Sequence, residues 1–257
     1  MIELKNINKY YNPGSVNELC LFDNFNLTVN SGEFVSVVGS NGSGKTSMLN
    51  IICGSIPIDS GNILVNGIDI TAKKDYLRHK KIGRVFQDPS KGTCPSMNIL
   101  ENMSIADNKG RPFNLGSGTN KSKIEYYREL LRPLNLGLED KMYTQVGSLS
   151  GGQRQALSLL MSTMTPIEFL ILDEHTAALD PKTAEIIMQL TNKIVTEKKL
   201  TTIMVTHNLR YAVEYGDRLI MMHEGSVIMD KVGEEKKKVQ TEEIMRIFNK
   251  ISVECGN

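Results

Sequence analysis

The chain has 257 residues, of which 40% are hydrophobic, enough for one large or two small domains with a substantial core. Its 30 basic and 29 acidic side chains leave a net charge of +1, which argues against a protein that holds nucleic acid through a strong positive field. The four cysteines include no C-x-x-C pair, so neither a zinc site nor a disulfide framework is indicated. No apolar run approaches the ~20 residues of a membrane helix, so we expect a cytoplasmic protein that reaches a membrane only through a partner.

The first third of the chain contains two types of strand signal. Residues 2–5, 21–29 and 61–67 alternate between apolar and polar side chains, which indicates antiparallel strands with one buried face. The segment 34–38, "FVSVV", is almost continuously apolar and predicts a strand buried on both faces. It continues into a glycine-rich loop and then into a helix over residues 46–54.

The buried type of strand returns at residues 169–173 and 201–207. Between them, Asp180 and Pro181 predict the start of a helix, because an aspartate N-cap followed by proline is a typical helix opening. The expected buried stripe of this helix consists of Ile186, Ile187, Leu190 and Ile194. A strand, a helix and a second strand in this order indicate a parallel sheet.

The stretch 88–164 lacks strand signals and predicts a helical insertion. It contains a connector rich in Gly, Asn and Lys at 107–123 and an amphipathic helix whose apolar stripe is Ile124, Tyr127, Leu131 and Leu134. Beyond residue 207 we expect a short helix ending near Gly216, a hairpin turning at Glu224–Gly225, and a solvated charged linker at 233–238. The stripe of the last helix consists of Ile244, Ile247, Phe248 and Ile251.

The loop "GSNGSGKT", residues 39–46, has the phosphate-binding spacing G-x-x-x-x-G-K-[ST] between a buried strand and a helix. Its glycines let backbone N–H groups point inward, and the helix N-terminus adds partial positive charge. Lys45 would neutralise the β- and γ-phosphates, Thr46 would bind Mg²⁺ and Ser47 would reach the α-phosphate. The predicted nucleotide-binding residues are Gly39, Ser40, Asn41, Gly42, Ser43, Gly44, Lys45, Thr46 and Ser47.

Two carboxylates complete the predicted hydrolytic site. The apolar strand 169–173 ends in Asp173, which would hold Mg²⁺ through water, and Glu174 follows in a position to accept a proton from an attacking water.

A second glycine-rich segment, "LSGGQ" at 149–153, raises a separate question. The Ser150 hydroxyl and the glycine N–H groups open a helix whose stripe is Ala156, Leu157, Leu160 and Met161, so they form an anion site at a positive helix end. In isolation such a segment would be an ordinary N-cap. The chain has one candidate phosphate loop, so the anion for this second site must come from elsewhere.

These motifs occur in a family order. Together with Gln87 after "KIGRVF", "AALD" at 177–180 and His207 after "IMVT", the sequence resembles the nucleotide-binding subunits of ATP-binding cassette (ABC) transporters over essentially residues 1–235. The resemblance implies an α/β P-loop NTPase fold with a RecA-like parallel-sheet core, an N-terminal antiparallel β subdomain and a helical subdomain insertion. It implies a single domain in which 1–87 and 165–235 form the catalytic core, 88–164 the helical subdomain and 236–257 a C-terminal helix.

The resemblance also implies roles for individual residues. Two subunits, identical or alike, pack head to tail, and one copy grips the γ-phosphate of ATP held in the loop of the other copy. The gripping residues are Ser150, Gly151, Gly152 and Gln153. Gln87 approaches Mg²⁺ and the attacking water, His207 contacts the γ-phosphate and orients Glu174, and Asp180 touches the opposite subunit. Taken alone, His207 is equally compatible with a structural hydrogen bond and Asp180 with a helix N-cap.

Tyr11 matches the family's aromatic residue that stacks on adenine, and Tyr10 should face the other way on a strand. Stacking uses the ring face and reads no base edge, so we expect weak discrimination between ATP and GTP. The alternative is that both tyrosines are ordinary surface residues of a strand.

Two segments depart from the commonest family pattern: the apolar "SLLMSTM" at 158–164 and Asn208 after His207, where aspartate is more usual. With "QDPSKGTCPSMNILENM" and "RLIMMHEG", they resemble ATPases of bacterial amino-acid uptake systems that have a branched-chain-type permease and an extracytoplasmic substrate-binding protein. Such an ATPase lies on the inner face of the cell membrane.

One alternative within transport remains open, and two others from different classes are disfavoured by the sequence. The N-terminal part, including "YYNPGSVNELCLF", also resembles lipoprotein-release and macrolide-export ATPases. A soluble ABC ATPase acting on ribosomes or DNA would typically carry a second cassette, long coiled coils or zinc modules, which this sequence lacks. A binding module without turnover would lack Glu174 or His207, and both are present.

Overall fold

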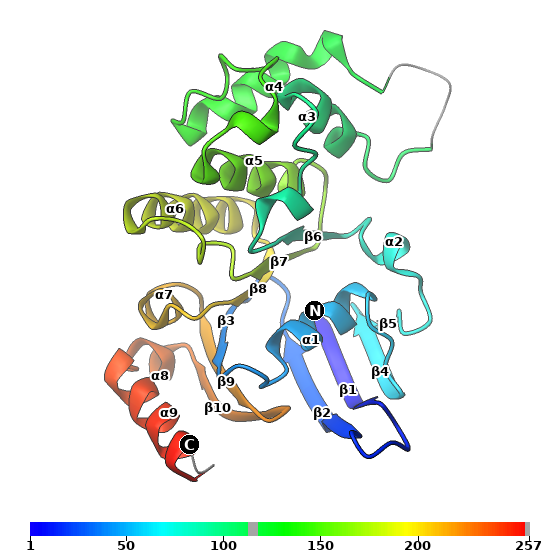
Figure 1. Cartoon of the computed structure of the whole chain (residues 1–257), viewed down its shortest axis with the longest axis vertical. Coiled ribbons are helices and arrows are strands. Elements are labelled where there is room, and N and C mark those ends of the chain that lie inside the picture. The colour runs from blue at the N-terminus through cyan, green and yellow to red at the C-terminus, as the bar shows by residue number, and fades with distance from the viewer. Residues whose placement is uncertain (113–117, 255–257) are drawn as a thin grey trace. The chain divides into compact units, whose positions relative to one another are not determined.

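The computed structural model describes residues 1–112 and 118–254, so part of the predicted connector and the last three residues lie outside the description. The chain forms two compact units, and each is described by itself. The first unit comprises Met1–His79 and Lys199–Asn257, and the second comprises Lys80–Lys198. Figure 1 labels their elements along the chain.

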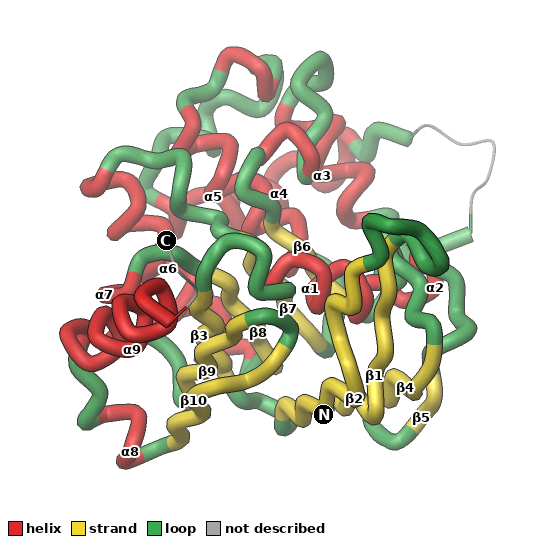
Figure 2. The backbone as a smooth tube through the Cα atoms, turned by 60° about the horizontal axis from the view of Figure 1, so that its bottom comes forward, coloured by secondary structure: helices red, strands yellow, loops and turns green. Residues whose placement is uncertain are grey.

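An antiparallel sheet forms one part of the first unit (Figure 2). Its strand order is β2-β1-β4-β5. The strands are β1 (Ile2–Tyr11), β2 (Leu19–Val29), β4 (Ser60–Val65) and β5 (Ile68–Asp69). On β1 the apolar residues Ile2 and Leu4 are buried, as the alternating pattern predicted. Ile7 is also buried, beyond a register shift between Leu4 and Ile7. This sheet confirms the predicted antiparallel β subdomain.

A second sheet in the first unit is built around β3 (Phe34–Gly39), which is buried along its whole length. It lies between β8 (Thr201–Val205) and β9 (Arg218–His223) and runs parallel to both. The neighbouring strand β10 (Ser226–Val232) is antiparallel to β9, and the predicted hairpin is confirmed by the pairing of His223 with Ser226. The helix α1 (Lys45–Cys53) follows β3 after the glycine-rich loop.

The remaining helices of the first unit are α2 (Asp75–Arg78), α7 (Leu209–Glu214), α8 (Glu234–Lys237) and α9 (Thr241–Glu254). The predicted stripe of the last helix is confirmed. Ile244 is buried in a cluster with Val38, Ala212 and Met221. Ile247, Phe248 and Ile251 pack against the same cluster.

The prediction of a solvated linker at 233–238 is confirmed for most of its residues, which are exposed, and was wrong for Lys236 and for the local structure. Residues 234–237 form helix α8, and Lys236 is only 3% exposed. Its ammonium group donates hydrogen bonds to the carbonyl oxygens of Val213 and Tyr215, at the C-terminal end of α7. Helix ends leave carbonyl groups without an intrahelical partner, and the two hydrogen bonds to such carbonyls offset part of the cost of burying the lysine charge.

The second unit pairs β6 (Ile82–Val85) in parallel with β7 (Phe169–Asp173) and contains the predicted helical segment 88–164. Its helices are α3 (Ile99–Asp107), α4 (Ile124–Leu131), α5 (Gly151–Thr163) and α6 (Pro181–Lys198). Short 3₁₀ turns occupy 89–91, 121–123, 132–134 and 146–148. The core is a cluster of apolar side chains from these helices, with Tyr127 and Leu157 among its fully buried members.

Two details of the helical prediction need correction. Helix α4 ends at Leu131, and Leu134 is buried from a 3₁₀ turn, because Pro133 has no N–H to continue the α-helical ladder. On α6, Ile186 is 38% exposed. The buried face of α6 consists of Ala184, Ile187, Met188, Thr191, Ile194 and Val195, and it includes a small and a polar residue that an apolar count overlooks.

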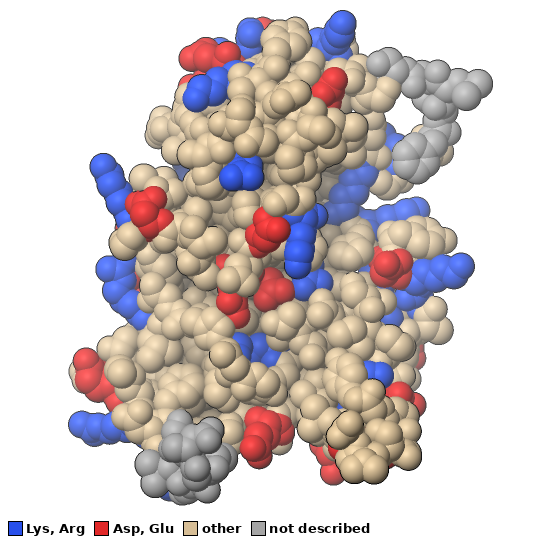
Figure 3. Space-filling model, viewed as in Figure 1, with Lys and Arg blue, Asp and Glu red and all other residues tan. Residues whose placement is uncertain are grey.

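No helix within residues 1–112 and 118–254 combines the length and the apolar character needed to cross a membrane. Basic and acidic side chains are interspersed on the face drawn in Figure 3.

Candidate functional site

The glycine-rich loop links β3 to α1 in a way that requires glycine at two points. A Cβ atom on Gly39 would lie 2.3 Å from the carbonyl oxygen of Met222 on β9, closer than any side chain tolerates. Gly44 precedes α1 with φ of 97°, in the left-handed region, and its Cβ would lie 3.0 Å from the ring of Phe22. No side chain caps the N-terminus of α1, so its first N–H groups are available to an anion.

Lys45 places its charge inside this loop. It is 5% exposed, and its ammonium group donates to the carbonyl oxygens of Gly39 and Ser40, each at 2.8 Å, and to Ser43 Oγ at 3.3 Å. These bonds hold a positive charge where the loop's N–H groups converge, which is the arrangement that a phosphate chain requires. Next to it, Thr46 is exposed and Ser47 half-buried, so both hydroxyl groups of the first turn are accessible.

His207 lies just beyond the end of β8. The N–H of Thr206 donates to the Val37 carbonyl at 3.1 Å, which continues the pairing of β8 with β3, and His207 follows as an exposed side chain. Asn208 then caps α7 by accepting a hydrogen bond from the Tyr211 N–H at 3.3 Å. Asparagine thus fills the capping role that the more usual aspartate would fill here.

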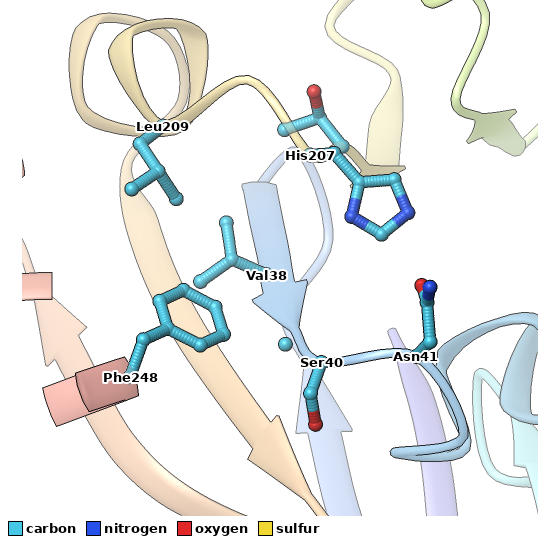
Figure 4. A pocket seen from close by; sticks show the side chains of 8 residues that line it. Val38, Ser40, Asn41, His207, Leu209 and Phe248 are labelled. Atoms are coloured by element: carbon cyan, nitrogen blue, oxygen red, sulfur yellow. The ribbon is translucent and has the colours of Figure 1, made fainter. Parts of the chain in front are cut away.

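A pocket of about 240 Å³ joins His207 to the start of the phosphate loop (Figure 4). The side chain of Asn41 points toward the imidazole ring, and Phe248 of α9 contributes to the apolar side of the pocket. The remaining lining residues are Val38, Gly39, Ser40, Thr206 and Leu209. Within the first unit, the structure therefore brings the histidine and the phosphate loop to one pocket.

Tyr11 is the last residue of β1 and is half-buried, with the ammonium group of Lys9 5.5 Å from the centre of its ring. The hydroxyl of Tyr10 is engaged differently, since a hydrogen bond with Cys20 raises the pKa of this phenol. The stacking of Tyr11 on adenine stays a prediction.

In the second unit, the buried strand β7 carries Asp173 to its carboxyl end. Its Oδ2 atom lies 2.8 Å from Nη2 of Arg84 on β6, and the two side chains are only 12% and 7% exposed. The guanidinium group also lies over the ring of Phe86, 4.6 Å from its centre. The sequence prediction missed Arg84, although a single arginine inside the apolar strand "KIGRVF" signals that it needs a buried partner.

Glu174, the predicted base, has a strained backbone. Its φ angle is 51°, in the left-handed region that non-glycine residues rarely adopt. Such conformations cost about 1–3 kcal/mol and persist where the surroundings impose them, frequently at active sites. Its carboxylate is half-buried, and its carbonyl oxygen accepts a hydrogen bond from the Ala177 N–H at 3.0 Å.

Gln87 follows β6 as an exposed side chain. The residue before it is anchored to α5, because Gln155 Nε2 donates to the Phe86 carbonyl oxygen at 3.0 Å. Gln155 is 1% exposed and was also missed from the sequence.

The segment Ser150–Gln153 opens α5 as a capping box. The Gln153 N–H donates to Ser150 Oγ, and the Ser150 N–H donates to Gln153 Oε1, both at 3.2 Å. Because the serine oxygen accepts in this arrangement, its hydrogen remains available to a phosphate oxygen. Ser150 and Gly151 are exposed, whereas a Cβ on Gly152 would lie 2.2 Å from Thr183 Cγ2 on α6. The ordinary N-cap and the anion site are therefore compatible.

Asp180 is confirmed as the N-cap of α6, where it accepts a hydrogen bond from the Thr183 N–H at 3.1 Å. Hydrogen bonds from Thr183 hold the pKa of this carboxyl below its usual range. Its predicted contact with a second subunit stays a prediction.

The available donor groups fit ATP and Mg²⁺. For the triphosphate, the structure offers the glycine cradle, an uncapped helix N-terminus and the buried ammonium group of Lys45. Mg²⁺ prefers oxygen ligands from few carboxylates completed by phosphate and water. Thr46 in the first unit offers a hydroxyl, and Gln87 and Asp173 in the second unit offer an amide and a carboxylate oxygen, and that the three hold one Mg²⁺ stays a prediction. Among the described residues, no three His, Cys, Asp or Glu side chains gather into a site that would hold a metal without a nucleotide.

A sequence family described as "ABC transporter" matches residues 22–177. A tyrosine transport ATP-binding protein of Clostridioides difficile (strain R20291) is 48% identical over 250 residues, which cover 96% of this chain and 98% of that protein. A probable ABC transporter ATP-binding protein of Campylobacter jejuni subsp. jejuni is 32% identical over 249 residues, covering 96% of this chain and 97% of that protein.

Solved structures show the same similarity. A dimeric ATP-binding cassette in a post-hydrolysis state, bound to ADP and Pi, superposes with a TM-score of 0.76 at 32% identity. The superposition covers 90% of this chain and 98% of that one.

Proposed function

This chain belongs to the ABC transporter family as an ATP-hydrolysing subunit, and on that premise we propose that two copies close head to tail on two ATP molecules to drive uptake of an aromatic amino acid such as tyrosine. The observation that carries the proposal is the exposed anion site at Ser150 and Gly151, which lies in a unit whose described residues contain no phosphate loop. A second copy supplies the phosphate that this site lacks. The dimeric state of the similar cassette supports the same arrangement.

In this proposal the γ-phosphate links two chains. Lys45 of one copy and Ser150 of the other hold it, Glu174 accepts a proton from the attacking water, and His207 contacts the phosphate and orients that water. Thr46, Gln87 and Asp173 would hold Mg²⁺, which when bound neutralises charge on the β- and γ-phosphates. Hydrolysis removes the link, so the closed dimer loses the interaction that distinguishes it from the open one.

We assign the transport step to membrane partners. ATP-driven closing and opening would act on permease subunits from the inner face of the membrane, and an extracytoplasmic binding protein would deliver the amino acid. The relative that is 48% identical over almost the whole chain and is named for tyrosine transport supports this choice of substrate.

The dimer is tested by replacing Glu174 with glutamine. We expect Glu174→Gln to bind ATP and to hydrolyse it at least about 100-fold more slowly than the wild type, because only the proton acceptor is lost. The variant should therefore accumulate as a dimer, measured by light scattering. Lys45→Ala is the matched control and should stay monomeric with ATP. A Glu174→Gln protein that remains monomeric beside a wild type that hydrolyses ATP as a monomer contradicts the proposal.

Sharing of the site between chains is tested by mixing two inactive variants. Ser150→Phe and Lys45→Ala should each be inactive alone. Their mixture should recover turnover, because one of its two sites combines an intact Lys45 with an intact Ser150 from the other chain. Absence of recovery in mixed dimers that have been verified by mass would place both residues of each site on one chain.

The substrate is tested in proteoliposomes that contain the complete transporter. We expect tyrosine with its binding protein to stimulate ATP hydrolysis several-fold and to accumulate inside, whereas leucine should do neither. Stimulation by leucine alone would contradict the aromatic assignment while leaving the ATPase assignment in place.

A further inference from the structure

The ion pair between Arg84 and Asp173 carries an inference that rests on the proposed role of Asp173 at the metal. We propose that Arg84 is a positioning residue that holds the Asp173 carboxylate ready before nucleotide arrives and competes with the divalent cation for it. Arg84 thereby lowers the affinity of the site for metal and makes metal binding depend on the phosphates.

The register of β6 and β7 explains how the two groups meet. Arg84 is paired with Ile171, so Asp173 lies two residues farther along the neighbouring parallel strand. Residues two apart on a strand share one face and are about 6–7 Å apart along it, a distance that an arginine side chain spans. The observed distance of 2.8 Å between Arg84 Nη2 and Asp173 Oδ2 is the result.

Phe86 fixes the same guanidinium group from a second side. Arg84 and Phe86 are also two residues apart on the chain, and the ring centre lies 4.6 Å from Cζ. Arginine pairs well with a carboxylate and an aromatic face at once, because its planar group can use its edge for hydrogen bonds and its face for stacking. The arginine is therefore held in place independently of Asp173.

Burial makes each charge of the Arg84–Asp173 pair depend on the other. With side-chain exposures of 7% and 12%, neither charge is well solvated, and removing one partner would leave the other charge buried without compensation. Arg84 thus supplies the positive charge that Asp173 needs while no metal is bound.

The same positive charge opposes a cation at Asp173. One carboxylate oxygen is already used by the guanidinium group, and two cations close together in a poorly solvated site repel each other. A neutral residue at position 84 should therefore bind a divalent cation more tightly in the nucleotide complex, and should lose stability when metal and nucleotide are both absent.

The test uses the full chain, a non-hydrolysable ATP analogue and Mn²⁺ as the probe, with free Mn²⁺ measured by electron paramagnetic resonance. We expect Arg84→Met to bind Mn²⁺ about 3- to 10-fold more tightly than the wild type in the presence of the analogue. Its melting temperature in EDTA should fall, and saturating Mn²⁺ with the analogue should restore most of the loss.

A matched control is available at another arginine ion pair. Arg218 pairs with Asp230 at 2.6 Å, with side-chain exposures of 13% and 39%, in the first unit. Arg218→Met should lower the melting temperature while leaving the Mn²⁺ affinity unchanged. If Arg84→Met does not fold, Arg84→Gln takes its place, because glutamine removes the charge and keeps an N–H donor for Asp173.

Asp173→Asn separates the two hypotheses, because it should weaken Mn²⁺ binding at least about tenfold if this carboxylate serves the metal. Unchanged binding in Asp173→Asn would overturn the metal role proposed above. If Asp173→Asn weakens binding while the neutral variant at position 84 binds Mn²⁺ within twofold of the wild type, or more weakly, only the inference about Arg84 is overturned.

Discussion

The side-chain amide of Gln155 on α5 donates from Nε2 to the carbonyl oxygen of Phe86 at 3.0 Å. This bond ties the helix that begins with Gly151 to the residue directly before Gln87. Since both partners lie in the second unit, a shift of α5 relative to β6 would act through this hydrogen bond on the backbone next to Gln87.

Replacing Gln155 with alanine should loosen this connection. We expect Gln155→Ala to lower the free energy of unfolding by about 1–3 kcal/mol, because the Phe86 carbonyl loses its donor in a partly buried position. The ATPase rate should fall several-fold while ATP affinity stays within twofold, since no residue of the phosphate loop takes part in this hydrogen bond. Urea unfolding, steady-state ATPase assays and ATP-binding titrations measure the three effects.

Gln189 provides the control for that prediction. It is an exposed glutamine on α6 whose Nε2 donates to Glu185 Oε1, one turn away, at 3.3 Å. Gln189→Ala should change neither stability nor turnover measurably. Equal effects of the two substitutions would refute a specific role for Gln155.

Two glycines of the phosphate loop should respond differently to substitution by alanine. Gly39→Ala should reduce ATP affinity at least about 100-fold, because its Cβ would lie 2.3 Å from the Met222 carbonyl and force the loop away from β9. Gly42→Ala meets no atom within 4 Å and changes only a left-handed residue with φ of 81°, so it should cost about 1 kcal/mol of stability and far less affinity. Binding of a fluorescent ATP analogue compares them, and equal losses would show that crowding at Gly39 is not the cause.

The sequence predicted those parts of the fold that depend on local signals. Continuous burial of 34–38, the glycine spacing after it and the proline behind Asp180 each act within a few residues, and the structure has β3, α1 and α6 at these places. The buried face of α6 was predicted only in part, because Thr191 is buried as a polar residue and Ile186 is exposed.

The contacts that the sequence did not reveal join distant positions. Arg84 and Asp173 are 89 residues apart, and Gln155 and Phe86 are 69 apart. Each contact depends on strand register or helix placement, for which no periodic pattern exists in the sequence. Lys236 was missed for a related reason, since only the packing of α8 shows that the end of α7 needs a donor.

The C-terminal helix should support the pocket beside His207. Phe248→Ala should lower the free energy of unfolding by about 1–3 kcal/mol, because a partly buried ring beside Val38 and Leu209 is lost from the apolar side of the pocket. The ATPase rate should fall about 2- to 5-fold as the loop that carries His207 loses this support. Thermal unfolding and ATPase assays measure both.

Met245, on the same helix, is the matched control for Phe248. It is 54% exposed, so Met245→Ala should change stability by no more than about 0.5 kcal/mol and leave turnover unaltered. A full-activity Phe248→Ala protein would contradict the support of His207 by α9.

A last prediction concerns pH and His175, which is 2% exposed. Its Nε2 atom lies 3.2 Å from Thr191 Oγ1, and that hydroxyl donates its own hydrogen to the Ile187 carbonyl, so Nε2 carries a hydrogen and donates it to Thr191. Burial lowers the pKa of His175 to about 4 from the ordinary value of 6.5. Below pH 6.5 His175 therefore binds a proton in the unfolded chain but not in the folded chain. The free energy of unfolding falls as the pH falls toward 4.

The size of this loss of stability and the pH range in which it occurs follow from the two pKa values. Above pH 6.5 the contribution is complete, and between pH 6.5 and 4 the free energy of unfolding should fall by at most about 1.4 kcal/mol per pH unit. We expect the wild type to lose about 1–2 kcal/mol more than His175→Gln between pH 7.5 and pH 5, measured by urea unfolding in EDTA without nucleotide. Parallel pH profiles for the two proteins would contradict this prediction. They would mean that His175 has an ordinary pKa in the folded state in spite of its burial against Thr191.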